Sequence, residues 1–146
     1  MNSLRKELDR LWKEAVYLRA GYKSELSGKE GKQIGGDHVL NAHHIIHKPN
    51  NYLRYSLDNG ICVTSGEHLY GCHGPQEERY REWIKEKRGQ DIYERLSIFK
   101  NNKVKDLLLV KIYLNEQIEK MNYMYRSIEF FKKNDPSFIK KTREKA

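Results

Sequence analysis

All six histidines of this chain lie in one segment of the sequence: His38, His43, His44, His47, His68 and His73. A neutral imidazole is the commonest side-chain metal ligand, and its proton affinity suits general-base catalysis near neutral pH. The concentration of histidines therefore predicts metal-assisted hydrolysis, in which one imidazole activates water beside a bound cation. We expect His38 and His47 to be surface or hydrogen-bonding residues and assign neither a catalytic role.

His43 and His44 are neighbours in a run that should form a strand, so their side chains are expected to point to opposite faces. One of the two can bind a metal while the other takes a proton from water on the far side of the substrate. His68, at the predicted start of a helix, and His73, further along it, could complete the metal site. The positive end of that helix would also favour the scissile phosphate.

Short strands and amphipathic helices are predicted around these histidines. Alternation and β-branched residues indicate strands over 39–46 and 61–64, with a turn signal at 57–60 between them. Residues 65–68 indicate the start of a helix, and residues 22–37 are rich in turn-forming types. Apolar residues at helical spacing predict one helix that ends near residue 19 and three later helices, at 76–87, 91–100 and 104–132. We therefore expect an α+β fold.

Length and composition favour a single domain that binds a polyanion. The 146 residues suit a single compact domain, with a catalytic core at about 22–75, a helical extension at about 76–134 and a basic tail at 135–146. Lysine and arginine outnumber the acidic residues by 28 to 20, which makes nucleic acid the first partner to consider. Neither an apolar signal region nor a membrane-length apolar run is present, so a cytoplasmic protein without a membrane partner is expected. Cys62 and Cys72 are too few for a disulfide framework.

Three sequence elements resemble the HNH endonucleases, the ββα-metal or His-Me finger family. The elements are Ala42-His43-His44-Ile45-Ile46, Leu57-Asp58-Asn59-Gly60-Ile61 and Glu67-His68. Asn59 follows His44 by fifteen residues and His68 follows Asn59 by nine, spacings similar to those of the colicin-type toxin DNases. The stretch 11–23 also resembles the lead-in of phage and prophage HNH endonucleases, so about the first half of the chain is covered.

The resemblance implies a ββα-metal core with one helix before it and about three after it. It also implies hydrolysis of phosphodiester bonds in double-stranded DNA, by nicking or cutting, with one divalent ion chosen from Mn, Ni, Zn, Co or Mg. A phage origin would add host-cell cytoplasm as the location and packaging proteins as possible partners. The alternatives are a non-catalytic DNA-binding or packaging-accessory protein on the same fold, and cleavage of RNA.

The family pattern also implies a role for individual residues. His43 and His68 would bind the metal, and His44 would be the general base that activates water. The last ligand is open between Cys72, at the spacing of the toxin DNases, and His73, at the spacing of the phage enzymes. We favour His73 because its imidazole matches the other ligands.

Two further residues receive less definite roles. Asn59 would orient the base or brace the turn through hydrogen bonds, and in some branches of the family the matching Asn binds metal. Arg54 lies in the predicted loop between the strands, where it could touch a DNA phosphate.

One part of the family pattern is missing from this chain. Many relatives carry two Cys-x-x-Cys pairs that hold a structural zinc, and the matching positions here are Ser24, Ser27, Thr64 and Glu67. We therefore predict no structural zinc, and we expect packing to hold this loop instead, with help from the C-terminal helices.

Overall fold

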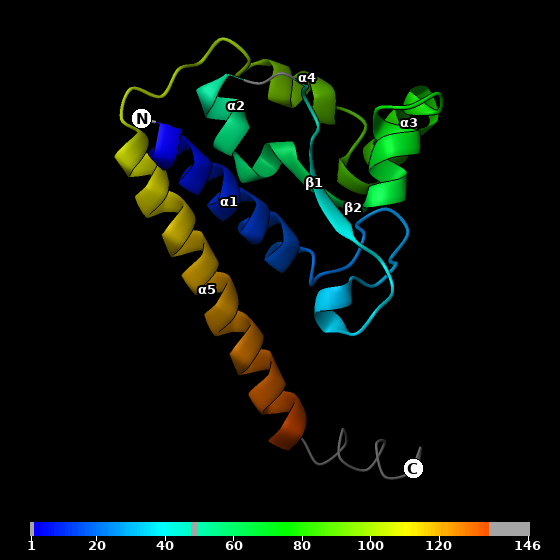
Figure 1. The fold of residues 1–146 in the computed structure, drawn as a ribbon, viewed down its shortest axis with the longest axis vertical. Coiled ribbons are helices and arrows are strands. Elements are labelled where there is room, and N and C mark those ends of the chain that lie inside the picture. The colour runs from blue at the N-terminus through cyan, green and yellow to red at the C-terminus, as the bar shows by residue number, and fades with distance from the viewer. Residues whose placement is uncertain (1, 48–49, 135–146) are drawn as a thin grey trace.

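The computed structural model describes residues 2–47 and 50–134, and its ribbon is drawn in Figure 1. The basic tail predicted at 135–146 lies outside the described residues. Within them no helix is both long enough and apolar enough to cross a membrane. The elements in chain order are α1 (Asn2–Arg19), a 3-10 turn (Lys32–Ile34), β1 (Leu40–His44), α2 (Asn51–Tyr55), a 3-10 turn (Leu57–Asn59), β2 (Gly60–Thr64), a π-helical turn (Glu67–Cys72), α3 (Glu77–Arg88), α4 (Ile92–Ser97) and α5 (Leu107–Asn134).

The two strands form a small antiparallel sheet that is covered on both faces. In the register of β1 and β2, Ala42 lies opposite Cys62 and His43 opposite Ile61. Every residue of β2 is buried. Because neighbouring strand residues face opposite ways, Cys62 belongs to one apolar cluster and Ile61 to another. Two hydrophobic cores therefore meet at this sheet.

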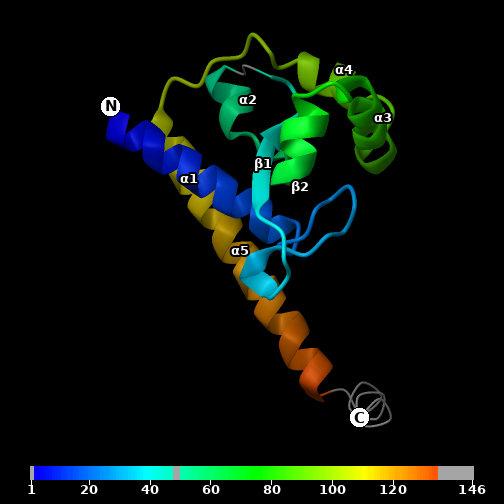
Figure 2. The same cartoon turned by 45° about the vertical axis from the view of Figure 1, so that its right-hand side comes forward.

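The first core lies between the sheet and the two long helices. It contains Cys62 with a stripe of α1, including Leu8 and Trp12, and the buried side of α5, including Val110 and Leu114. Figures 1 and 2 show α1 and α5 running side by side, with the C-terminal part of α5 extending beyond the rest of the protein. The helix α1 thus separates the sheet from α5.

The second core lies on the other face of the sheet, beneath the π-helical turn, α3 and α4. Its buried residues are Leu26, Ile45, Leu53, Ile61, Val63, Cys72, Ile84, Ile92 and Leu96. These side chains come from seven separate stretches of the chain, so this core ties the strands to the elements that follow them. Cys62, by contrast, is a small buried side chain of the first core.

The α+β class and the main elements agree with the sequence prediction. Both strands, the N-terminal helix and the three helices after Pro75 are present within a few residues of the expected bounds. The helix α2 was not predicted, because five residues are too few to show a helical period. Its one local signal is Asn50, whose side chain accepts a hydrogen bond from the Leu53 amide as a helix N-cap.

Gly60 offers a test of how closely α1 packs on the sheet. A Cβ atom at this position would lie 2.6 Å from Val16 Cγ2 and 2.8 Å from Trp12 Cζ2. We expect Gly60→Ala to lower the free energy of unfolding by about 1–3 kcal/mol, because overpacking must displace one of these side chains. Urea denaturation measures the change.

Gly66→Ala is the matched control for that substitution. Its Cβ would meet nothing closer than Thr64 Oγ1 at 3.9 Å, and its backbone is already in the right-handed helical region. Equal denaturation midpoints for the two variants would contradict close packing of α1 on β2.

Candidate metal centre

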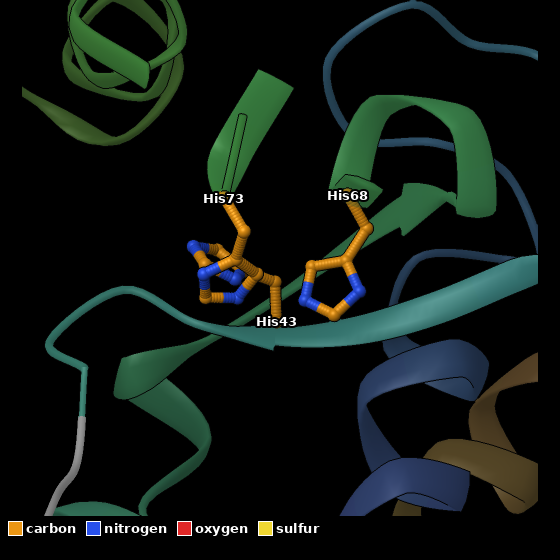
Figure 3. Close-up of side chains that lie close together, drawn as sticks. All are labelled: His43, His68 and His73. Atoms are coloured by element: carbon orange, nitrogen blue, oxygen red, sulfur yellow. The ribbon is translucent and has the colours of Figure 1, made fainter. Parts of the chain in front are cut away.

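Three imidazoles from two elements converge on one point. His43 comes from β1, whereas His68 and His73 come from the π-helical turn and its end (Figure 3). One nitrogen of each ring belongs to a set in which all atoms lie within 4.8 Å of one another. The ring centroids are 5.2 Å apart for His43 and His68, 5.0 Å for His43 and His73, and 4.6 Å for His68 and His73. These three residues could hold a metal ion.

The π-helical turn explains why His73 joins this cluster and Cys72 does not. The amide of His73 donates to the carbonyl of His68 at 3.1 Å, an i to i+5 hydrogen bond. An α-helical turn would instead stack the residue four positions later, Cys72, above His68. The Cys72 side chain is buried in the second core, and burial raises the pKa of its thiol to about 12. A thiol that stays protonated is a poor ligand, so the geometry favours His73.

Gly71 allows the turn to lie directly on α3. A Cβ atom at this position would come within about 2.6 Å of ring atoms of Tyr80, so only glycine fits between the turn and that ring. The π-helical turn therefore packs against Tyr80 of α3, while the side chains of His68 and His73 point toward His43 (Figure 3).

A reciprocal pair of hydrogen bonds fixes the start of the turn. The amide of Glu67 donates to Thr64 Oγ1 at 3.1 Å, and the amide of Thr64 donates to Glu67 Oε1 at 2.8 Å. This is a capping box, which satisfies two backbone donors that a helix start would otherwise leave free. Thr64 is the last residue of β2 and Glu67 precedes His68, so the capping box sets the position of His68 relative to the sheet.

The same carboxylate also holds the loop that follows α1. Ser24 Oγ donates to Glu67 Oε1 at 2.7 Å and accepts hydrogen bonds from the amides of Leu26 and Ser27. Ser24, Thr64 and Glu67 are all buried. These are positions that the family resemblance matches to the zinc-binding cysteines. Packing and a C-terminal helix do contribute, because Leu26 is buried in the second core and Glu25 is paired with Arg88 of α3. The buried carboxylate of Glu67 adds a hydrogen-bonded link between this loop and the turn that the sequence did not predict.

His43 has the properties of a metal ligand that is ready for binding. Its side chain is buried, and Nδ1 has no hydrogen-bond partner among the described residues. Burial, followed by the nearby rings of His68, His47 and His73, lowers its pKa to about 3. The ring is therefore neutral at physiological pH and keeps a free lone pair. Because a buried polar atom without a partner costs free energy, a bound cation would satisfy it.

His44 faces the opposite side of β1, as its position in the strand predicts. Its ring stacks on Trp12 with centroids 4.1 Å apart and planes at 7°, and its Nε2 lies 3.0 Å from the carbonyl oxygen of Arg54. A carbonyl can only accept, so Nε2 carries the proton and Nδ1 keeps the lone pair. Burial lowers the pKa of His44, so the ring is neutral near pH 7. Nδ1 of His44 can therefore accept a proton.

The helix α1 supplies two residues to this side of the site. Besides Trp12, Asp9 accepts two hydrogen bonds from the Arg54 guanidinium, at 2.9 and 2.8 Å. The ion pair fixes the residue whose carbonyl holds His44. Sequence reasoning missed both residues, because they are distant in the chain and look like ordinary members of an amphipathic helix. A contact between Arg54 and DNA stays a prediction, and it would compete with Asp9.

Asn59 closes the loop between the strands. It is fully buried; its Oδ1 accepts from the amide of Ile46 at 2.8 Å, and its Nδ2 donates to the carbonyl of Leu53 at 3.1 Å. Of the roles considered from sequence, this geometry fits bracing of the turn. The side-chain amide of Asn59 is therefore engaged in hydrogen bonds to the loop that follows His44.

His47 lies next to the cluster, a position that its sequence context did not predict. Its ring centroid is 5.1 Å from that of His43 and 4.7 Å from that of His73. His38 makes no such ring contact within the described part of the chain. The only available signal for His47 is its closeness in sequence to His43.

Comparisons with known protein families, with curated proteins and with solved structures found no match to this chain.

Replacing Glu67 by Gln tests the buried carboxylate. Burial raises its pKa, but hydrogen bonds from the Thr64 backbone and from Ser24, Ser27 and Thr64 side chains outweigh this and lower the pKa below 4.5. The stability that the ionised Glu67 carboxylate contributes is fully present above pH 4.5. It is lost as the pH falls through the lowered pKa of the folded protein. We expect Glu67→Gln to cost about 1–2 kcal/mol at pH 7, because charged hydrogen bonds become neutral ones.

That cost should shrink as the pH falls through the folded-state pKa, since Glu67 of the wild type is then protonated. Denaturation curves from pH 7 to strongly acidic pH measure it. Glu78→Gln, on the exposed side of α3, is the control and should change little at any pH. A cost for Glu67→Gln that does not vary with pH would contradict the ionised carboxylate.

Thermal unfolding with added metal tests which residues form the cluster. An ion that binds only the folded protein, at a free concentration a hundred times its Kd, adds about 2.7 kcal/mol to stability. We expect Ni²⁺ or Zn²⁺ to raise the Tm of the wild type, EDTA to reverse the rise, and His73→Ala to lose most of it.

Cys72→Ala is the matched variant in this experiment. It should lower the metal-free Tm because a buried side chain is lost, yet keep the rise caused by metal. A metal-induced rise that disappears in Cys72→Ala and survives in His73→Ala would reverse the assignment.

Proposed function

We propose that this protein is a metal-dependent HNH-type endonuclease that hydrolyses phosphodiester bonds of double-stranded DNA. The observation that supports the proposal is that His43 and His44, adjacent residues of β1, lie on opposite faces of the strand in two different environments. His43 contributes to a three-imidazole cluster on one face, and the next residue, His44, presents an unprotonated Nδ1 on the other. The sequence elements that resemble HNH enzymes include these same residues, which supports the ββα-metal reading of the strands and the turn.

In this proposal His43, His68 and His73 hold one divalent ion. When bound, the ion supplies a Lewis acid that stabilises negative charge on the phosphate and on the leaving oxygen. Three neutral imidazoles suit Zn, Ni, Co or Mn, and suit Mg less well because it prefers oxygen ligands. The buried position of His43 keeps its ring neutral and excludes water from one side of the site.

His44 is proposed as the general base. Its Nδ1 would take a proton from the attacking water, while the hydrogen bond to the Arg54 carbonyl would steady the imidazolium that forms. The stacked ring of Trp12 limits rotation of His44, and the Asp9 ion pair holds the backbone that carries the accepting carbonyl. The net charge of +8 supports DNA as the polyanionic substrate.

Cleavage of supercoiled plasmid in the presence of Mn²⁺, Ni²⁺, Zn²⁺ or Mg²⁺ tests this function. We expect His44→Ala to slow cleavage by about 10²–10⁴-fold, the usual contribution of a general base, while metal binding is retained. His43→Ala should lose both metal binding and cleavage. His38→Ala removes a histidine outside the cluster and should cleave like the wild type.

Two results would contradict the proposal. If wild type and His44→Ala leave the plasmid equally intact but retard it in a gel, the protein is a DNA-binding protein without catalysis. If an RNA competitor is degraded in preference to DNA, the activity is of a different nucleolytic class.

A further inference from the structure

We infer that His47 is a fourth imidazole ligand of the ion held by His43, His68 and His73. The inference rests on the metal centre of the proposed function and adds a ligand to it. His47 lies outside the sequence elements that resemble HNH enzymes, and it follows β1 in the loop rather than in the strand. Its assignment comes from its position in space.

The spacing of the rings carries the inference. A metal–nitrogen bond of about 2 Å puts a ring centroid about 3 Å from the ion, so rings that share an ion stand about 5 Å apart. The three clustered rings are separated by 4.6 to 5.2 Å. His47 lies 5.1 Å from His43 and 4.7 Å from His73, which is the same spacing.

His47 still differs from the three in one respect. It is not part of the group whose nitrogens all lie within 4.8 Å, so its ring must move inward to reach the ion. No hydrogen bond holds the His47 ring within the described residues, and its side chain is exposed, so the ring is free to turn toward the ion. His44, by contrast, is fixed by a stacked ring and a hydrogen bond.

A fourth imidazole would change which ions are active in the site. Four nitrogen ligands complete the tetrahedral shell that zinc prefers and leave no position for a phosphate oxygen. A six-coordinate ion such as Ni²⁺ or Mn²⁺ would keep two positions for water and phosphate. His47 would therefore let the protein bind zinc tightly while cleaving DNA poorly with it.

Metal titration of the full chain tests the ligand directly, without reference to nuclease activity. The ions are Ni²⁺ and Co²⁺, and the variants are His47→Ala and His47→Gln, with His38→Ala as the matched histidine control. Loss of a group that only orients a ligand costs 10- to 100-fold in metal affinity, so we expect at least about a tenfold rise in Kd for both His47 variants. The visible absorption of bound Co²⁺ should also change, because its intensity depends on the number and geometry of ligands.

A Kd and a Co²⁺ spectrum indistinguishable from those of His38→Ala would overturn the inference. Far-UV circular dichroism of the metal-free variants confirms that each is folded before titration. If the wild type binds no divalent ion, this inference and the proposed function fail together. If it binds the ion through His47 but cleaves no nucleic acid, only the proposed function fails.

Discussion

The carboxylate of Glu67 is the constraint on which the candidate metal centre depends. It accepts hydrogen bonds from the amide of Thr64 and the hydroxyl of Ser24, and so connects the end of β2, the loop after α1 and the start of the π-helical turn. A buried carboxylate is unfavourable unless donors surround it, and here the donors come from segments that would otherwise be free to separate. His68 follows immediately, so any displacement of Glu67 would move an imidazole of the three-histidine cluster. A charged side chain thus connects the loop after α1, the end of β2 and the start of the turn.

The pleat of β1 and the π-helical turn then distribute the histidines. Because adjacent strand residues face opposite ways, His43 enters the imidazole cluster and His44 contacts α1. In the turn, the backbone hydrogen bond from His73 reaches back five residues to His68 instead of four, which places the two imidazoles side by side. Neither feature requires an unusual residue at the ligand positions. What they require is a firm support, which Gly71 provides by allowing the turn to rest on Tyr80.

Sequence reasoning could predict the strands, the long helices and the residues of the cluster, since each has a local pattern. Periods of two and of 3.6 identify β2 and α5, and the side-chain chemistry of histidine identifies His43, His68 and His73 as candidate ligands. The preference for His73 over Cys72 rested on side-chain chemistry alone, because the i to i+5 hydrogen bond that brings His73 into the cluster has no sequence signature. Trp12 and Asp9 were missed for a different reason. Their contribution depends on how α1 packs against the loop after β1, which is a long-range contact.

The role of His47 illustrates the same limit. A histidine a few residues beyond a strand is ordinarily a surface group, and only the path of the loop brings its ring to the cluster. Spatial convergence, and not the number of histidines, therefore defines the candidate site. The helix α1 belongs to this site although none of its residues is in the cluster. Its Trp12 stacks on His44, and its Asp9 holds Arg54, whose carbonyl accepts from His44.

Anomalous diffraction from crystals of the His44→Ala variant, grown with Ni²⁺ and a short DNA duplex, tests the central claim most directly. The expected result is a nickel ion bonded to nitrogens of His43, His68 and His73, joined by His47, with a phosphate oxygen of the duplex in one of the remaining coordination positions. A nickel ion bound by Cys72 or by surface carboxylates, or a duplex whose phosphates lie away from the ion, would contradict it.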